Sequence, residues 1–155
     1  MEIFVTAGKG EGNTPLSAFD KALNDAGIAN YNLIYLSSII PPKAKVRLLK
    51  PHLQNKEYGN KLYIVMAKAI QVDFGKEAWA GVGWVQAGDG RGMFVEHTGE
   101  NRNDVVRLIK KSLTDMKKYR KWRFGKIHYA VIGNECKNKP ICVVVSAVYK
   151  SEGWK

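Results

Sequence analysis

Residues 30–42 read NYNLIYLSSIIPP. Most of the residues before the prolines are β-branched, aromatic or leucine, a composition that favours an extended strand. The two prolines then forbid continuation as a central strand, because proline has no N–H to donate to a sheet ladder. The segment therefore predicts a strand over 31–40 that ends close to the serine pair Ser37 and Ser38.

Similar apolar runs on both sides of this segment predict further strands. We expect them at 2–7, 61–73, 78–88, 92–97, 126–136 and 140–149. Glycines at positions 8, 10 and 12 follow the first run, and we interpret them as a flexible loop. Because short turns join consecutive strands, we expect mostly antiparallel pairing.

Two other segments have helical periodicity. Asn13 or Thr14 can cap a first helix that begins at Pro15. Its apolar residues recur every three or four positions as far as Gly27. Residues 101–119 carry a second apolar stripe, which we expect to face the core. The order of strand, helix, strands, helix and strands predicts an α+β fold whose helices cover a sheet.

The composition is that of one globular domain of 155 residues, with 45% hydrophobic and 25% charged residues. No stretch reaches the roughly 18 apolar residues of a membrane span, so we expect no membrane partner and a cytoplasmic protein. Cys136 and Cys142 flank a four-residue turn and could face each other across a hairpin, and we expect both to be reduced. Two thiols are too few for a zinc site, so no metal is expected.

The net charge of +11 makes nucleic acid a conceivable partner. Cations are densest over 117–126, where Tyr119 and Trp122 interleave with lysines and arginines, as a stacking surface requires. The chain has no zinc-finger spacing and no evident helix-turn-helix, and basic solvated helix faces are common. Nucleic-acid binding is therefore the weaker interpretation of the charge.

The segment at 30–42 resembles the self-cleavage site of the pyruvoyl-dependent arginine decarboxylase family. A serine pair alone merely ends a strand, but here an apolar strand runs into LSSIIPP, with Asn32 six residues before the second serine. The glycine-rich start, the helix that carries Asp20 and the later FVEH at 94–97 follow in the family's order. The resemblance therefore covers most of the chain.

This resemblance implies a single domain over 1–155 that cuts itself into a β chain, 1–37, and an α chain, 38–155. Ser38 would attack the carbonyl of Ser37 and become a pyruvoyl group, a covalent cofactor that replaces pyridoxal phosphate and needs no metal. The enzyme would convert L-arginine to agmatine and CO2 through a Schiff base on that group. The family fold is a four-layer αββα sandwich with mostly antiparallel sheets, and its members are homotrimers with interfacial sites.

The resemblance also implies roles for individual residues. Asn32 would stabilise the oxyanion of self-cleavage, and Glu96 would protonate the carbanion left by decarboxylation. Asp20 would pair with the substrate guanidinium, and Leu23 would also bind substrate. His97 lies next to Glu96 but faces the other side of the strand, so it is the weaker candidate.

The position of Asn32 poses a geometric problem. Residues 32, 34, 36 and 38 share one face of an extended strand. Asn32 and Ser38 would nevertheless be about 20 Å apart in a straight strand at ~3.3 Å per residue. Either the chain bends near Ser37, or Asn32 acts through a neighbouring subunit.

Three alternatives belong to other functional classes. The chain could decarboxylate another amino acid, because the side-chain pocket decides the substrate. It could be an unprocessed paralogue that keeps the fold as a binding or regulatory subunit. It could also be a basic nucleic-acid-binding protein, whose retention on DNA or RNA would weaken strongly with salt.

The first prediction concerns the covalent state of the purified protein. We expect the intact mass, measured under denaturing and reducing conditions, to show two fragments, 1–37 and 38–155, with a pyruvoyl group at the start of the larger one. A single uncut chain would favour the inactive-paralogue interpretation.

Overall fold

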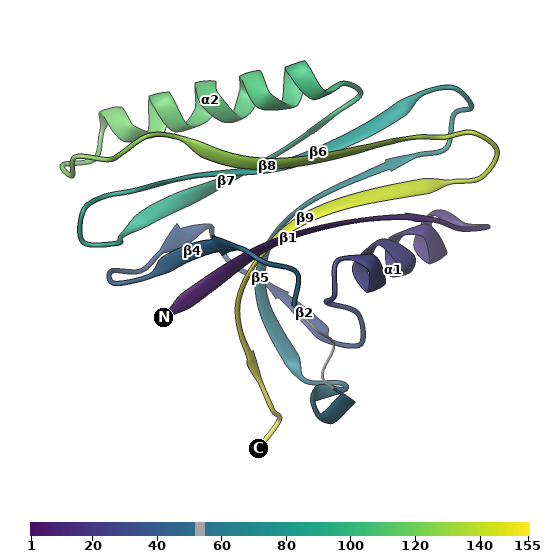
Figure 1. The fold of residues 1–155 in the computed structure, drawn as a ribbon, viewed down its shortest axis with the longest axis horizontal. Helices are drawn as coiled ribbons and strands as arrows, with labels where there is room; N and C mark the ends of the chain where they lie inside the picture. Colours follow the sequence, from purple (N-terminus) through teal and green to yellow (C-terminus); the bar gives the residue numbers. More distant parts are fainter. Residues whose placement is uncertain (52–54) are drawn as a thin grey trace.

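The computed structural model describes residues 1–51 and 55–155, and it has two helices on the outer faces of two stacked sheets (Figure 1). The helices are α1 (Pro15–Asp25) and α2 (Arg102–Lys118), with a 3-10 turn η1 (Asn55–Glu57). The strands are β1 (Glu2–Glu11), β2 (Asn32–Tyr35), β3 (Ile39–Ile40), β4 (Lys45–Leu48), β5 (Lys61–Gln71), β6 (Glu77–Gln86), β7 (Gly92–Gly99), β8 (His128–Glu135) and β9 (Ile141–Glu152).

The nine described strands form two sheets. Sheet A has the order β2-β5-β9-β1-β4, and sheet B has the order β3-β7-β6-β8. Among the described strands, only the pairs β1–β4 and β2–β5 are parallel. All other ladders in the described part of the chain are antiparallel. The prediction of mostly antiparallel sheets is confirmed.

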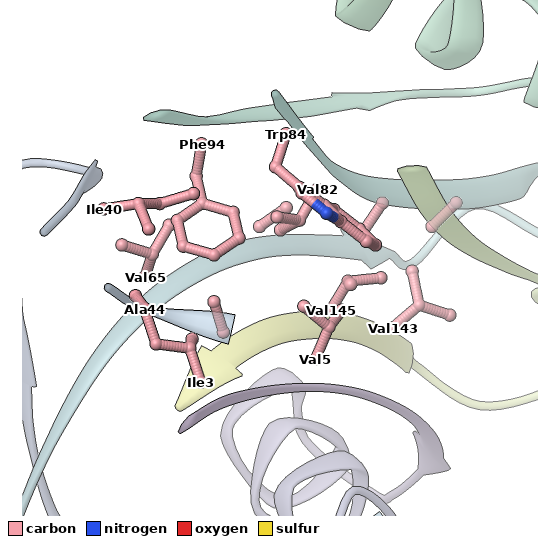
Figure 2. Close-up of a cluster of buried hydrophobic side chains, with 14 of the residues drawn as sticks. Ile3, Val5, Ile40, Ala44, Val65, Val82, Trp84, Phe94, Val143 and Val145 are labelled. Atoms are coloured by element: carbon pink, nitrogen blue, oxygen red, sulfur yellow. The ribbon is translucent and has the colours of Figure 1, made fainter. Parts of the chain in front are cut away.

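Three hydrophobic clusters hold the layers together. Figure 2 shows the central one, in which Val5 and Val145 of sheet A meet Trp84 and Phe94 of sheet B. A second cluster lies between α1 and sheet A, and a third lies between α2 and sheet B. The order of layers is therefore α1, sheet A, sheet B and α2, and the predicted αββα sandwich is confirmed.

The predicted single strand over 31–40 is wrong, because this segment forms two strands in different sheets. β2 pairs with β5 in sheet A, whereas β3 pairs with β7 in sheet B. The apolar composition is the same on both sides of the break, and only the tertiary pairing separates the two strands. The short strand β4, which pairs with β1, was not predicted.

The predicted glycine loop is also wrong, because β1 continues to Glu11. A Cβ on Gly8 would lie 2.3 Å from the carbonyl oxygen of Ala22, and one on Gly10 would lie 2.5 Å from that of Ala18. Both carbonyls belong to α1. These glycines therefore serve close packing of the helix on the strand, not flexibility.

Helix α1 begins as predicted. Thr14 is its N-cap and accepts a hydrogen bond from the backbone N–H of Ser17, and Pro15 occupies the first turn. Its apolar side packs on sheet A, so the outward side is free for polar residues.

The cysteines do not face each other across a hairpin, because β8 and β9 belong to different sheets. Both are free thiols, as predicted; Cys136 packs between the sheets and Cys142 faces α1. Burial raises the pKa of Cys142 to about 11, so this thiol stays protonated at neutral pH. In the described residues, no helix combines the length and the apolar character that crossing a bilayer requires.

Gly10→Ala tests the close contact of α1 with β1. The new methyl group would lie 2.5 Å from backbone atoms of both Ala18 and Ala22, so the helix must move. We expect the free energy of unfolding in urea to fall by about 1–3 kcal/mol. Gly88→Ala is the control, because its Cβ meets no atom within 4 Å. Equal stability of the two variants would contradict this packing role.

Candidate active site at the crossover between the sheets

The peptide bond between Ser37 and Ser38 lies where the chain passes from sheet A to sheet B. The backbone N–H of Leu36 donates the last bond to sheet A, to the Ile64 carbonyl, at 2.8 Å. The backbone N–H of Phe94 in β7 donates to the Ser38 carbonyl, also at 2.8 Å. The peptide bond between Ser37 and Ser38 therefore lies between two anchored residues, Leu36 bonded to sheet A and Ser38 bonded to sheet B.

Ser38 has an unusual backbone conformation. Its φ is +67°, in the left-handed region that serine seldom adopts. A non-glycine residue held there is strained by roughly 1–3 kcal/mol. This strain is located at one of the two residues of the predicted cleavage site.

The side chain of Ser38 contacts Glu96. Its hydroxyl donates a hydrogen bond of 2.6 Å to Glu96 Oε1, and Glu96 is a half-buried residue of β7. The two residues are 58 positions apart in sequence. The structure thus brings together a hydroxyl nucleophile and a carboxyl group that can exchange a proton with it.

His97 faces away from Ser38, as strand alternation predicted. Its Nε2 lies 2.8 Å from Ser112 Oγ on α2, on the other side of sheet B. Burial lowers the pKa of His97, and the nearby Glu96 charge offsets only part of this effect. The imidazole therefore belongs to the packing between α2 and sheet B.

Tyr149 in β9 also lies at this site and was not predicted. Its hydroxyl donates a 2.9 Å hydrogen bond to the carbonyl of Ile39, the residue that follows Ser38. Its ring meets Phe94 edge-on, with centroids 6.0 Å apart. Burial and the charge of Glu96 both raise the pKa of the phenol, so it remains a donor at neutral pH.

Strand periodicity was the one available sequence signal for Tyr149. Val143, Val145 and Ala147 all face the space between the sheets, and position 149 continues that series. Nothing local in the sequence connects Tyr149 to Ile39, 110 positions away.

Asn32 lies apart from Ser38. It is exposed at the start of the edge strand β2, and its amide Nδ2 donates to the Gly59 carbonyl at 2.8 Å. The strand ends at Tyr35, so the shared face expected for residues 32–38 does not continue to Ser38. The chain bends at Ser38, but the Asn32 amide remains directed to Gly59.

Asp20 and Leu23 are both on α1 but in different surroundings. Asp20 is exposed and lines a polar pocket of about 520 Å³ together with Glu11 and Asn24. Leu23 is 9% exposed and packs between α1 and sheet A. Neither Ser38 nor Glu96 lines this pocket. In one chain, therefore, the predicted substrate residues and the predicted cleavage site are separate.

In the basic segment at 117–126, a guanidinium group lies over one face of each of two aromatic rings. Arg91 lies over the Trp122 ring at 4.5 Å, and Arg120 lies over the Tyr119 ring at 4.8 Å. A base that stacked on the same face of either ring would have to compete with these guanidinium groups. Across residues 1–51 and 55–155, no group of three or more metal-ligating side chains is assembled.

Comparison with known proteins gives a consistent result. The family model described as "Pyruvoyl-dependent arginine decarboxylase" matches residues 2–153. Curated relatives with that name include one from Thermoplasma volcanium, 40% identical over 54% of this chain and 46% of the relative. Another, from Thermococcus sibiricus, is 29% identical over 92% of this chain and 90% of the relative.

The Archaeoglobus fulgidus protein named "Pyruvoyl-dependent arginine decarboxylase 2" is 36% identical over 64% of both chains. The matched part of this chain thus spans about half to two thirds of the Thermoplasma and Archaeoglobus relatives.

Proposed function

The chain belongs to the pyruvoyl-dependent arginine decarboxylase family, and from this premise we propose that it cuts itself between Ser37 and Ser38 and then decarboxylates L-arginine to agmatine and CO2. The observation that carries the proposal is the pairing of a strained Ser38 with Glu96. A left-handed serine whose hydroxyl meets a carboxylate at 2.6 Å has no evident role in packing.

The cleavage reaction balances on residues 37 and 38 and one water molecule. The Ser38 hydroxyl attacks the Ser37 carbonyl carbon, and the peptide C–N bond breaks, so that an ester replaces the amide. Loss of the Ser38 α-proton then expels the Ser37 carboxylate and leaves dehydroalanine. Water converts this group to a pyruvoyl group and releases ammonia. The hydroxyl proton passes to the amide nitrogen that is released, and the 2.6 Å hydrogen bond supports Glu96 as the group that orients the hydroxyl.

The surroundings of residue 38 fit a pyruvoyl group. The Phe94 N–H holds the carbonyl of residue 38, which remains as an amide carbonyl after cleavage, and Glu96 faces the side chain. A pyruvoyl group supplies a ketone that condenses with the substrate amine and withdraws electrons as CO2 leaves. Glu96 is the carboxyl residue that hydrogen-bonds to the side chain of residue 38. This contact supports its role in returning a proton to the substrate carbon.

The proposed substrate contact needs a second subunit. Asp20 lies on α1, outside sheet A, whereas Ser38 lies at the start of sheet B. One arginine molecule can meet both only if a neighbouring chain brings its α1 to the Ser38 site. We therefore propose the homotrimer of the family, with active sites at the subunit interfaces.

The same arrangement would give Asn32 access to the oxyanion of a neighbouring chain. β2 is an edge strand, and the Asn32 side chain is exposed on it. Glu11 and Asp20 are the acids of the α1 pocket, which Lys21 and Lys139 also line, so the attraction for arginine rests on a direct pairing with Asp20 and not on the overall charge of the pocket. The proposed location is the cytoplasm, where free arginine is available as a biosynthetic substrate.

Ser38→Ala and Glu96→Gln should separate the two reactions. Ser38→Ala removes the nucleophile, so we expect an intact chain and no agmatine. Glu96→Gln keeps an acceptor for the Ser38 hydroxyl but no acidic proton, so we expect cleavage with loss of most turnover. Intact mass and agmatine formation report the two results.

Ser37→Ala is the matched control, because the Ser37 hydroxyl takes no part in the chemistry and cleavage should persist. Cutting of the Ser38→Ala chain at the same bond would contradict the mechanism outright. Normal formation of agmatine by the Glu96→Gln variant would contradict the proposed role of Glu96 as the proton donor.

Asp20→Ala should weaken arginine use and leave self-cleavage unchanged. Loss of a hydrogen bond to a charged group predicts a fall in kcat/KM of roughly 10- to 150-fold. Asp115→Ala is the control, because it removes one exposed carboxylate from the far helix α2 and changes the net charge equally. Equal kcat/KM values in the two variants would exclude Asp20 as the guanidinium partner.

A further inference from the structure

Strand β3 is held by a bond on each of its edges. It contains only Ile39 and Ile40 and lies at the edge of sheet B, paired with β7 alone. On that side, the Phe94 N–H holds the carbonyl of Ser38. On the other side, the Ile39 carbonyl has no strand partner, and the hydroxyl of Tyr149 occupies it at 2.9 Å. A side chain of sheet A therefore completes the edge of sheet B.

Strand β9 is irregular where Tyr149 occurs. The register with β5 runs from Ile64–Val148 directly to Tyr63–Lys150, so Tyr149 has no partner on β5. An extra residue of this kind is a β-bulge, which bends the strand and redirects a side chain, and bulges are frequent next to active sites. The irregularity lies at the residue of β9 that donates a hydrogen bond to β3.

We propose that Tyr149 is a positioning residue for position 38, holding β3 so that the reacting residue stays against Glu96. This inference rests on the proposed function, since it assigns a residue to the same reaction. Tyr149 contacts the chain next to the reacting group, not the group itself. Its effect is therefore on geometry, and misplacement by about 1 Å can slow a reaction 100-fold.

Cleavage increases the need for this support. Before the cut, residue 38 is tied to sheet A through Leu36, which bonds to Ile64. After the cut, residue 38 becomes a chain end that continues only into β3. The Phe94 N–H bond to its carbonyl, the two-residue strand β3 and the Tyr149 hydrogen bond then fix its position. Loss of the phenol should therefore slow turnover more than it slows cleavage.

Tyr149→Phe tests the inference, because it keeps the aromatic ring against Phe94 and removes only the hydroxyl. We expect kcat per pyruvoyl group to fall roughly tenfold, as expected for loss of one hydrogen bond that aligns a reacting group. The KM for arginine should stay within about twofold, and the rate of self-cleavage should fall less than kcat.

Tyr63→Phe is the matched control. It also removes a phenol hydrogen bond, the 2.6 Å contact with Glu152, from the position on β5 opposite Lys150, and this bond does not involve β3. Both variants should lose similar thermal stability, and only Tyr149→Phe should lose turnover. p-Aminophenylalanine at position 149 keeps a hydrogen donor on the ring and should restore kcat. This rescue separates positioning from general loosening of the fold.

The outcomes are distinct. A kcat for Tyr149→Phe within twofold of the unsubstituted enzyme would overturn the positioning role while leaving the proposed function intact. Equal losses of kcat in Tyr149→Phe and Tyr63→Phe would also overturn it, because the effect would then be one of stability. If the unsubstituted chain neither cuts itself nor forms agmatine, the proposed function fails, and the inference fails with it.

Discussion

The chain changes sheets within three residues, and the position of the reactive group depends on this crossover. Leu36 still bonds to β5 in sheet A, and Ser38 already bonds to β7 in sheet B. The turn between them is made at Ser38, whose φ of +67° would suit glycine better. A glycine there would relieve the strain but would remove the hydroxyl. The site thus retains a residue that the backbone disfavours, which is common where strain serves a reaction.

The local features of the fold were predictable because local chemistry determines them. Thr14 and Pro15 mark the start of α1 by capping and by fixed φ, whatever the rest of the chain does. The break between β2 and β3 was not predictable in this way, because the residues on both sides of it are equally suited to strands. Likewise, Gly8 and Gly10 suggested a loop, since the sequence alone does not show the helix that packs against them.

In the candidate site, too, some residues could be predicted from the sequence and others could not. Ser38 and Glu96 were named from a resemblance, and the structure brings them into contact, although their roles remain proposals. Tyr149 was missed because its partner Ile39 is 110 residues away in the sequence. Within one chain, Asp20 lines a pocket that Ser38 does not line, and the Asn32 amide bonds to Gly59, so the sequence could suggest their roles but not the assembly that would unite them with Ser38.

The strand order of sheet A determines whether the proposed enzyme could refold after it has been cleaved. β1 lies in its interior between β9 and β4, and β2 forms its edge on β5. A cut after Ser37 would therefore leave β1, α1 and β2 on one polypeptide, threaded into a sheet made by the other. The two pieces would share a single core, so nothing would separate while the protein stayed folded. Unfolding, however, would release two chains that have to find each other again, which makes recovery dependent on concentration. Such a protein can fold unimolecularly only once, before it acquires its reactive group.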